Sequence, residues 1–174
     1  MLFTIGHSTR SMEEFVALLR AHGVAQVADV RSIPKSRHCP QFHIDALGPS
    51  LRAAGIGYAH LKALGGRRST RKDSVNTGWR NASFRGYADY MGAEEFAKGL
   101  EELIAMAGER PTAIMCAEAV PWRCHRSLIA DALTLRGWDV REIVSAAPAK
   151  THKLAPFLQV IDGKQLYPAP GETS

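Results

Sequence analysis

The sequence predicts an α/β fold: an open, mainly parallel sheet of about five strands with helices on both faces, in a Rossmann-like three-layer arrangement. Short apolar runs recur along the 174 residues, and they are nearly continuous, as in strands that are buried on both faces. Segments with helical periodicity separate these runs. No repeat or second core is evident. We therefore expect a single domain over residues 1–170, with residues 145–170 as a packed C-terminal extension.

The first half of the chain holds three of the expected strands. The first covers residues 2–5. Ser11 then stands three residues before Glu14, which is the pattern of a capping box, and the helix that it begins ends at Gly23. A second strand, a helix and a third strand follow at residues 24–30, 42–54 and 56–61. We expect Gly48-Pro49 to break that helix into two pieces.

The second half continues the alternation after a polar and basic stretch at residues 67–83, which we expect to be a surface loop. Cys124 opens a segment whose apolar residues fall on one helical face, and Gly137 ends it. In order, the expected elements are helices at 84–92 and 94–106, a strand at 112–116, a helix at 124–136 and a strand at 138–144.

Composition and charge narrow the class of protein. Hydrophobic residues make up 45% and charged residues 22% of the chain, as in ordinary globular proteins. No apolar run approaches the length of a membrane span, so we expect no membrane association. Three cysteines without a framework-like spacing, and a beginning without a leader pattern, predict a cytoplasmic protein. A net charge of +5 favours an anionic partner, although ordinary solubility explains it equally well.

Residues with chemical potential follow the expected strands. Ligands bind at the carboxyl ends of the strands in an open parallel sheet, so these residues are expected to meet at one edge. In strand order they are His7 and Ser8, Arg31 and Ser32, Gly65 and Gly66, and Cys116 and Glu118. Each has an ordinary structural explanation when taken alone, such as a core cysteine, a hydrogen-bonded histidine or a glycine turn.

The segment MCAEAVPWRCHR, residues 115–126, contains the closest grouping of cysteine, histidine and charged side chains. The N-terminus of the following helix attracts anions and favours a thiolate at Cys124. His125 or Glu118 would carry a proton, and Arg126 suits bidentate hydrogen bonding to phosphate. Either Cys116 or Cys124 would be the reactive thiol. The structural alternatives are packed cysteines, a capping histidine and an ion pair between Glu118 and an arginine.

Cofactor and metal sites receive less support. No Walker loop or dinucleotide fingerprint is present, so no cofactor is expected. Cys116, Cys124 and His125, completed by His7 or Glu118, contain zinc-ligand side chains. Their C-x7-C-H spacing is not a common zinc signature, and we expect no metal.

Four segments occur in an order that resembles the domain-of-unknown-function 488 family: TIGHS, DVRSIPKS, GIGYAHLKALGG and CAE-x5-CHR, followed by a tail with HKLAPF and GKQLYP. The similarity covers residues 2–168. It implies a small bacterial or archaeal α/β protein without an established reaction. It also implies a site made of the motif residues His7, Ser8, Arg31, Ser32, Cys116, Glu118, Cys124, His125 and Arg126.

The leading functional hypothesis is an enzyme with a thiol-containing, anion-binding site that acts on a phosphate-bearing substrate, a nucleotide or a nucleic-acid component. Arg31 and Arg126 would hold the anion, and His7 and Ser8 would complete the pocket. One alternative is a non-catalytic nucleic-acid-binding module that uses the basic loop 67–80, with Trp79 and Phe84 as stacking platforms. The other is a metal-binding protein. The sequence does not indicate an oligomeric state.

Overall fold

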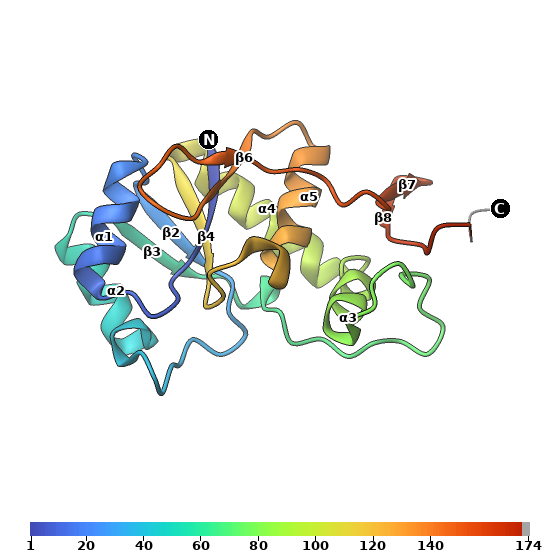
Figure 1. Ribbon diagram of the computed structural model, residues 1–174, viewed down its shortest axis with the longest axis horizontal. Coiled ribbons are helices and arrows are strands. Elements are labelled where there is room, and N and C mark those ends of the chain that lie inside the picture. Colours follow the sequence, from blue (N-terminus) through green and yellow to red (C-terminus); the bar gives the residue numbers. More distant parts are fainter. Residues whose placement is uncertain (172–174) are drawn as a thin grey trace.

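A six-stranded sheet forms the centre of the computed structural model, which describes residues 1–171 (Figure 1). Its strand order is β3-β2-β4-β1-β5-β6, and all neighbours are parallel except β5 and β6. The strands are β1 (Leu2–Gly6), β2 (Gln26–Asp29), β3 (Gly57–His60), β4 (Thr112–Cys116), β5 (Val140–Ile143) and β6 (Lys150–Thr151). The predicted α/β class with a mainly parallel sheet is confirmed.

Helices cover both faces because the crossovers run in two directions. From β1 the chain steps toward β3, and from β3 it steps back through β4 to β5. Right-handed crossovers therefore place the first two helices on one face and the last three on the other. The helices are α1 (Met12–Ala21), α2 (Ile44–Ala53), α3 (Ala82–Tyr90), α4 (Glu94–Glu109) and α5 (Arg126–Leu135).

Two apolar layers fill the space between the sheet and these helices. Successive strand residues point to opposite faces, so Ala113 and Met115 pack with α1 and α2. Ile114 and Cys116 pack on the other face, with α4 and α5. Cys116, the last residue of β4, is thereby directed toward the start of α5.

Two local expectations about helices are corrected. Helix α2 continues through Pro49 and is not broken into two pieces. Pro49 lies in its second turn, and loss of one N–H there leaves the rest of the helix bonded and packed through Leu47 and Leu51. Helix α5 begins at Arg126, so Cys124 precedes it and His125 occupies its N-cap. A short turn, η3 (Pro121–Arg123), lies between β4 and these two residues.

The C-terminal extension crosses the α5 side of the molecule as a strap that ends in a hairpin of β7 (Gln159–Ile161) and β8 (Lys164–Leu166) (Figure 1). His152 anchors it, because its ring nitrogens lie 2.6 Å from Asp131 Oδ1 and 2.8 Å from Glu142 Oε1. The Tyr167 hydroxyl donates to the same Asp131 at 2.8 Å. Within residues 1–171, none of the helices has the length and apolar character that crossing a membrane requires.

Candidate functional site

A cavity of about 390 Å³ lies at the carboxyl edge of β2 and β4, where the sequence places the candidate residues. We call it the thiol cavity. Residues from four sequence-distant segments line it, among them Arg31, Ser32 and Lys35; Gly66 and Arg67; Ser83 and Phe84; and Cys116, Glu118, Arg123, Cys124 and His125. The expected meeting of strand ends at one edge therefore gives a concave site with two thiols in its wall.

Cys124 and His125 form a thiol–imidazole pair. Nε2 of His125 lies 2.8 Å from the Val30 carbonyl oxygen. A carbonyl only accepts hydrogen bonds, so Nε2 carries the ring hydrogen and Nδ1 presents a lone pair. Nδ1 lies 3.5 Å from Cys124 Sγ. Burial lowers the pKa of His125 to about 4, and the positive charge of Arg126 acts in the same direction. The ring is thus neutral at neutral pH, and the lone pair of Nδ1 can accept a hydrogen bond.

The orientation of the imidazole is fixed by its packing. A side chain on Gly66 would place its Cβ 2.5 Å from His125 Nδ1, so only glycine allows this approach. The Tyr87 ring meets the imidazole edge-on, with 5.0 Å between centroids. These contacts restrict the ring, whose Nδ1 lies beside the sulfur of Cys124.

Cys116 and Cys124 are joined as a disulfide in this structure. Their sulfur atoms are in direct contact, and their Cα atoms are 7.5 Å apart. The backbone N–H of Arg126 points at Cys124 Sγ from 3.5 Å, while its guanidinium donates through Nη1 to Cys116 Sγ. Hydrogen bonds from a helix N-terminus and from a cation both favour thiolate over thiol. The pair has two chemical states, two thiols or, after oxidation, a disulfide.

Arg126 does not occupy the place expected of an anion ligand. Its side chain is fully buried, and its guanidinium donates to the carbonyl oxygens of Glu118 and Ala119. Burial lowers its pKa to about 10, so it remains a cation at neutral pH. Arg126 therefore holds the loop after β4 against the start of α5 and supplies a positive charge beside Cys116.

Arg31 is held by a buried carboxylate. Asp29 accepts from Nε of Arg31 at 2.9 Å and from Nη2 at 2.7 Å. The hydroxyl of Tyr58 donates to the same carboxylate at 2.6 Å. Burial is the main cause that raises the pKa of Tyr58, and this hydrogen bond is the second. The remaining nitrogen, Nη1, lies 3.5 Å from His7 Nε2. Arg31 reaches the thiol cavity with its orientation already set by Asp29.

The other candidates lie at or behind the cavity wall. Ser32 Oγ accepts from the backbone N–H of Arg67 at 2.8 Å, and Gly65 packs behind Ser32. His7 and Ser8 do not line the cavity. The His7 ring stacks on Phe42 with 4.3 Å between centroids and bonds the Ser8 carbonyl at 2.8 Å. Burial lowers the pKa of His7. Residues 7 and 8 support Arg31 from behind.

The charge of the cavity wall is mainly positive. Arg31, Lys35, Arg67 and Arg123 line it together with a single carboxylate, that of Glu118. In the part of the chain that the structure describes, Lys35, Arg67 and Arg123 make no ion pair. Unpaired cations in a concave site concentrate anions from solution.

A model of the family described as domain of unknown function DUF488 matches residues 11–133. The chain belongs to the DUF488 family. The match includes the whole thiol cavity, from Arg31 to His125, and leaves out His7, Ser8 and the strap. No curated protein and no solved structure matches the chain. This match confirms the resemblance seen in the sequence motifs. The family's description names no reaction.

The described residues of this DUF488 protein do not provide the ligand set that the metal-binding hypothesis requires. Across residues 1–171, no group of three or more His, Cys, Asp or Glu side chains is arranged to hold a metal ion. One ring nitrogen of each candidate histidine is engaged by the backbone, because His125 Nε2 bonds the Val30 carbonyl and His7 Nδ1 bonds the Ser8 carbonyl.

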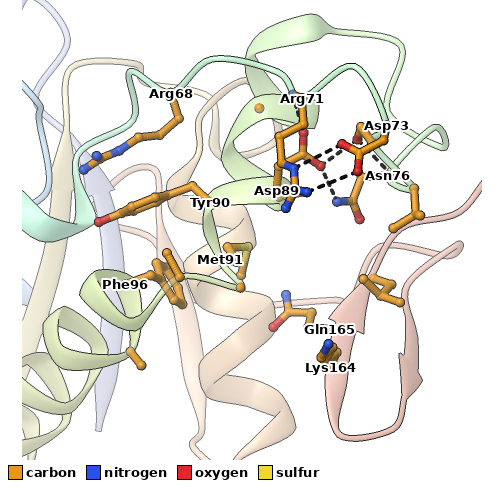
Figure 2. Close-up of a pocket in the computed structure, with 18 of the residues that line it drawn as sticks. Arg68, Arg71, Asp73, Asn76, Asp89, Tyr90, Met91, Phe96, Lys164 and Gln165 are labelled. Carbon is orange, nitrogen blue, oxygen red and sulfur yellow. Dashed lines mark hydrogen bonds and ion pairs between the residues drawn. The ribbon is translucent and has the colours of Figure 1, made fainter.

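The basic loop has its own fixed structure beside a cavity of about 780 Å³ between α3 and the β7–β8 hairpin (Figure 2). The Asp89 carboxylate accepts from the Arg71 backbone, from Ser74 Oγ at 2.6 Å and from Asn76 Nδ2 at 2.8 Å. The guanidinium of Arg68 lies 3.6 Å from the Tyr90 ring centre. Figure 2 shows these side chains directed toward their partners within the loop and α3.

Trp79 also differs from the expected stacking platform. Its ring packs edge-on against Phe84 and Phe157, with centroids 5.0 and 4.8 Å apart, and contacts Tyr167. Trp79 therefore belongs to an aromatic cluster that joins the basic loop to the strap. Trp79 and Phe84 are each half-buried by these contacts, and neither stands free on the surface as a separate platform.

Sequence reasoning missed several parts of this DUF488 site. The Val30 carbonyl that sets the His125 tautomer is a backbone atom and has no sequence signal. Asp29 did have one, because a carboxylate inside an otherwise apolar strand needs a buried partner. Trp122, in η3, is 70% exposed. Its position between the two cysteines was visible, but its exposure was not.

Proposed function

We propose that the protein is a thiol-dependent transferase or hydrolase that acts on a phosphate-bearing substrate in the thiol cavity. The observation that carries the proposal is the fixed tautomer of His125, whose Nδ1 lone pair faces Cys124 Sγ at 3.5 Å. A nucleophilic thiol next to an oriented base is the arrangement that covalent catalysis requires. The unpaired cations Lys35, Arg67 and Arg123 support an anionic substrate.

The proposed reaction has two steps in the reduced protein. His125 Nδ1 takes the proton of Cys124, and the thiolate attacks phosphorus, so that a sulfur–phosphorus bond forms and the ester P–O bond breaks. The proton on His125 passes to the departing oxygen. Water or an acceptor hydroxyl then displaces the sulfur, which regenerates the thiolate. Arg31 and the rim cations bind the phosphate oxygens throughout, since charge develops there in the transition state.

Cys124, and not Cys116, is assigned as the nucleophile. Cys124 adjoins both the imidazole and the first N–H of α5. The nearest charged group to Cys116 Sγ is instead the guanidinium of Arg126, which donates to it. Cys116 is then the second thiol of the pair, able to form a disulfide with Cys124 and so to remove the nucleophile.

The test is acid quenching of reduced protein after incubation with a panel of phosphate monoesters, with mass spectrometry of its peptides. The proposal expects a phosphoryl adduct on Cys124 and no adduct in Cys124→Ser. Cys39→Ser is the matched control, because Cys39 is buried outside the cavity and bonds the Ser8 carbonyl. Turnover of a panel substrate by Cys124→Ser at the wild-type rate would overturn the proposal.

A further inference from the structure

A second cavity, of about 590 Å³, lies next to the thiol cavity. We call it the strap cavity, because strap residues 150–157 form one wall and η3 and α5 the other. Three aromatic side chains line it: Trp79, Trp122 and Phe157. Its size and mainly apolar wall match those of small-molecule sites, which combine such surfaces with a few polar groups.

Trp122 is the unusual member of this wall. It is 70% exposed, the highest value among the exposed large hydrophobic side chains of residues 1–171. Pro121 beside it is buried and anchors the turn. Tryptophan on an anchored turn loses little conformational freedom when it binds a flat partner, and exposed aromatic faces are strong binding platforms.

Three charged groups of the strap cavity pair with one another, whereas Lys150 and Lys153, which also line it, make no ion pair among the described residues. His152 bonds both Asp131 and Glu142. Burial alone would lower the pKa of His152, but the two carboxylates outweigh it and raise the pKa to about 9. His152 is therefore charged at neutral pH, and together with Lys150 and Lys153 the wall carries three cations and two carboxylates. The apolar part of the wall and its three aromatic side chains suit an aromatic ring.

The two cavities are neighbours across one turn. Trp122 lines the strap cavity, while Arg123 and Cys124, the next residues, line the thiol cavity. On the other side, Trp79 of the strap cavity contacts Phe84 of the thiol cavity, with 5.0 Å between ring centroids. A single ligand that passes over η3 would place an anionic end by the thiols and a flat end on Trp122.

We infer that the strap cavity binds the heteroaromatic ring of a nucleoside phosphate whose phosphate group occupies the thiol cavity, with Trp122 as the stacking platform. This inference rests on the proposed function for the phosphate end only. It narrows the substrate class from phosphate esters in general to nucleotides. It also assigns the ring to Trp122 on η3 and not to the basic loop.

The experiment measures binding to the full-length, reduced protein by isothermal titration calorimetry with adenosine monophosphate, adenosine and ribose 5-phosphate. We expect adenosine monophosphate to bind at least about tenfold more tightly than ribose 5-phosphate, given the usual strength of base–aromatic stacking. Trp122→Ala should weaken both adenine ligands about tenfold and leave ribose 5-phosphate unchanged. Trp122→Phe should retain most of the affinity, and Leu135→Ala, an exposed change on the same side of the sheet, all of it.

The outcomes separate the two proposals. Equal binding of adenosine monophosphate and ribose 5-phosphate, or unchanged adenosine monophosphate binding in Trp122→Ala, would overturn the ring site even if Cys124 forms a phosphoryl adduct. If adenosine binding depends on Trp122 but Cys124 forms no adduct, the ring site is supported and the thiol mechanism is contradicted.

Discussion

His125 Nδ1 faces Cys124 Sγ across 3.5 Å because the Val30 carbonyl occupies the opposite ring nitrogen at 2.8 Å. Adjacent residues in a chain rarely control one another's side chains so closely. Here the N-cap position of His125 turns its ring back over Cys124, and β2 supplies the carbonyl that holds it. The reactivity proposed for Cys124 depends on that orientation.

Gly66→Ala should disturb the thiol pair without touching either cysteine. The added Cβ would lie 2.5 Å from His125 Nδ1, so the ring must move. We expect a lower alkylation rate at Cys124 and a loss of about 1–3 kcal/mol in the free energy of unfolding, typical of overpacking. Gly108→Ala is the control, since nothing lies within 4 Å of its Cβ position and alanine favours the helix there. An unchanged rate in Gly66→Ala would show that the ring position does not govern the thiol.

Asp29→Asn should destabilise the protein strongly. Asp29 is fully buried and neutralises Arg31, so the variant leaves a buried cation without its counter-charge. We expect a loss of about 3–5 kcal/mol in urea unfolding. The exposed pair of Asp73 and Arg71 provides the control: Asp73→Asn should cost less than about 1 kcal/mol. Similar losses in both variants would contradict a buried, structural role for the Asp29 carboxylate.

His152 should make stability depend on pH in the alkaline range. Its pKa is raised from 6.5 to about 9 in the folded protein, so the folded state binds the proton more tightly than the unfolded state. The resulting stabilisation is complete below pH 6.5 and is lost as the pH rises through about 9. Wild-type protein should lose about 2–3 kcal/mol over this window relative to His152→Gln. Parallel unfolding curves for the two proteins would rule out this linkage.

Arg67 and Arg123 should account for anion binding at the thiol cavity. Both line it and make no ion pair among the described residues. We expect inorganic phosphate to slow alkylation of Cys124, and Arg123→Ala or Arg67→Ala to weaken this protection about threefold to tenfold. Lys72→Ala, in the basic loop outside the cavity, should leave the protection unchanged. Protection that depends on Lys72 as much as on Arg123 would favour general charge over a defined site.

The fold was predictable from the sequence because strand burial leaves a direct signal. The apolar run at 2–5 lies within β1, and the run at 112–116 coincides with β4. The capping box at Ser11 begins α1 as expected. The expected break of α2 at Pro49 was wrong, because the packing of α2 on the sheet outweighs the local effect of one proline. The short strands of the strap gave no signal, since their pattern depends on pairing partners that are distant in sequence.

The site was predictable as a set of residues but not as a set of roles. Strand ends of a parallel sheet must meet, so Arg31, Cys116 and Cys124 were expected at one edge. Whether Arg126 faces a ligand or the protein depends on the path of the loop after β4, and the sequence does not encode that path in any short pattern. Burial turned Arg126 inward, onto Glu118 and Ala119, and left Arg123 on the cavity rim.

The most direct test of a reactive thiol at Cys124 is the alkylation rate of each cysteine as a function of pH, read by mass spectrometry on native, freshly reduced, metal-free protein. We expect Cys124 to react faster than Cys39, with an apparent pKa below the ~8.5 of a free thiol. We also expect that His125→Asn slows Cys124 about tenfold while His38→Asn, an exposed loop histidine, does not. A Cys124 that stays inert until the protein unfolds would contradict the account.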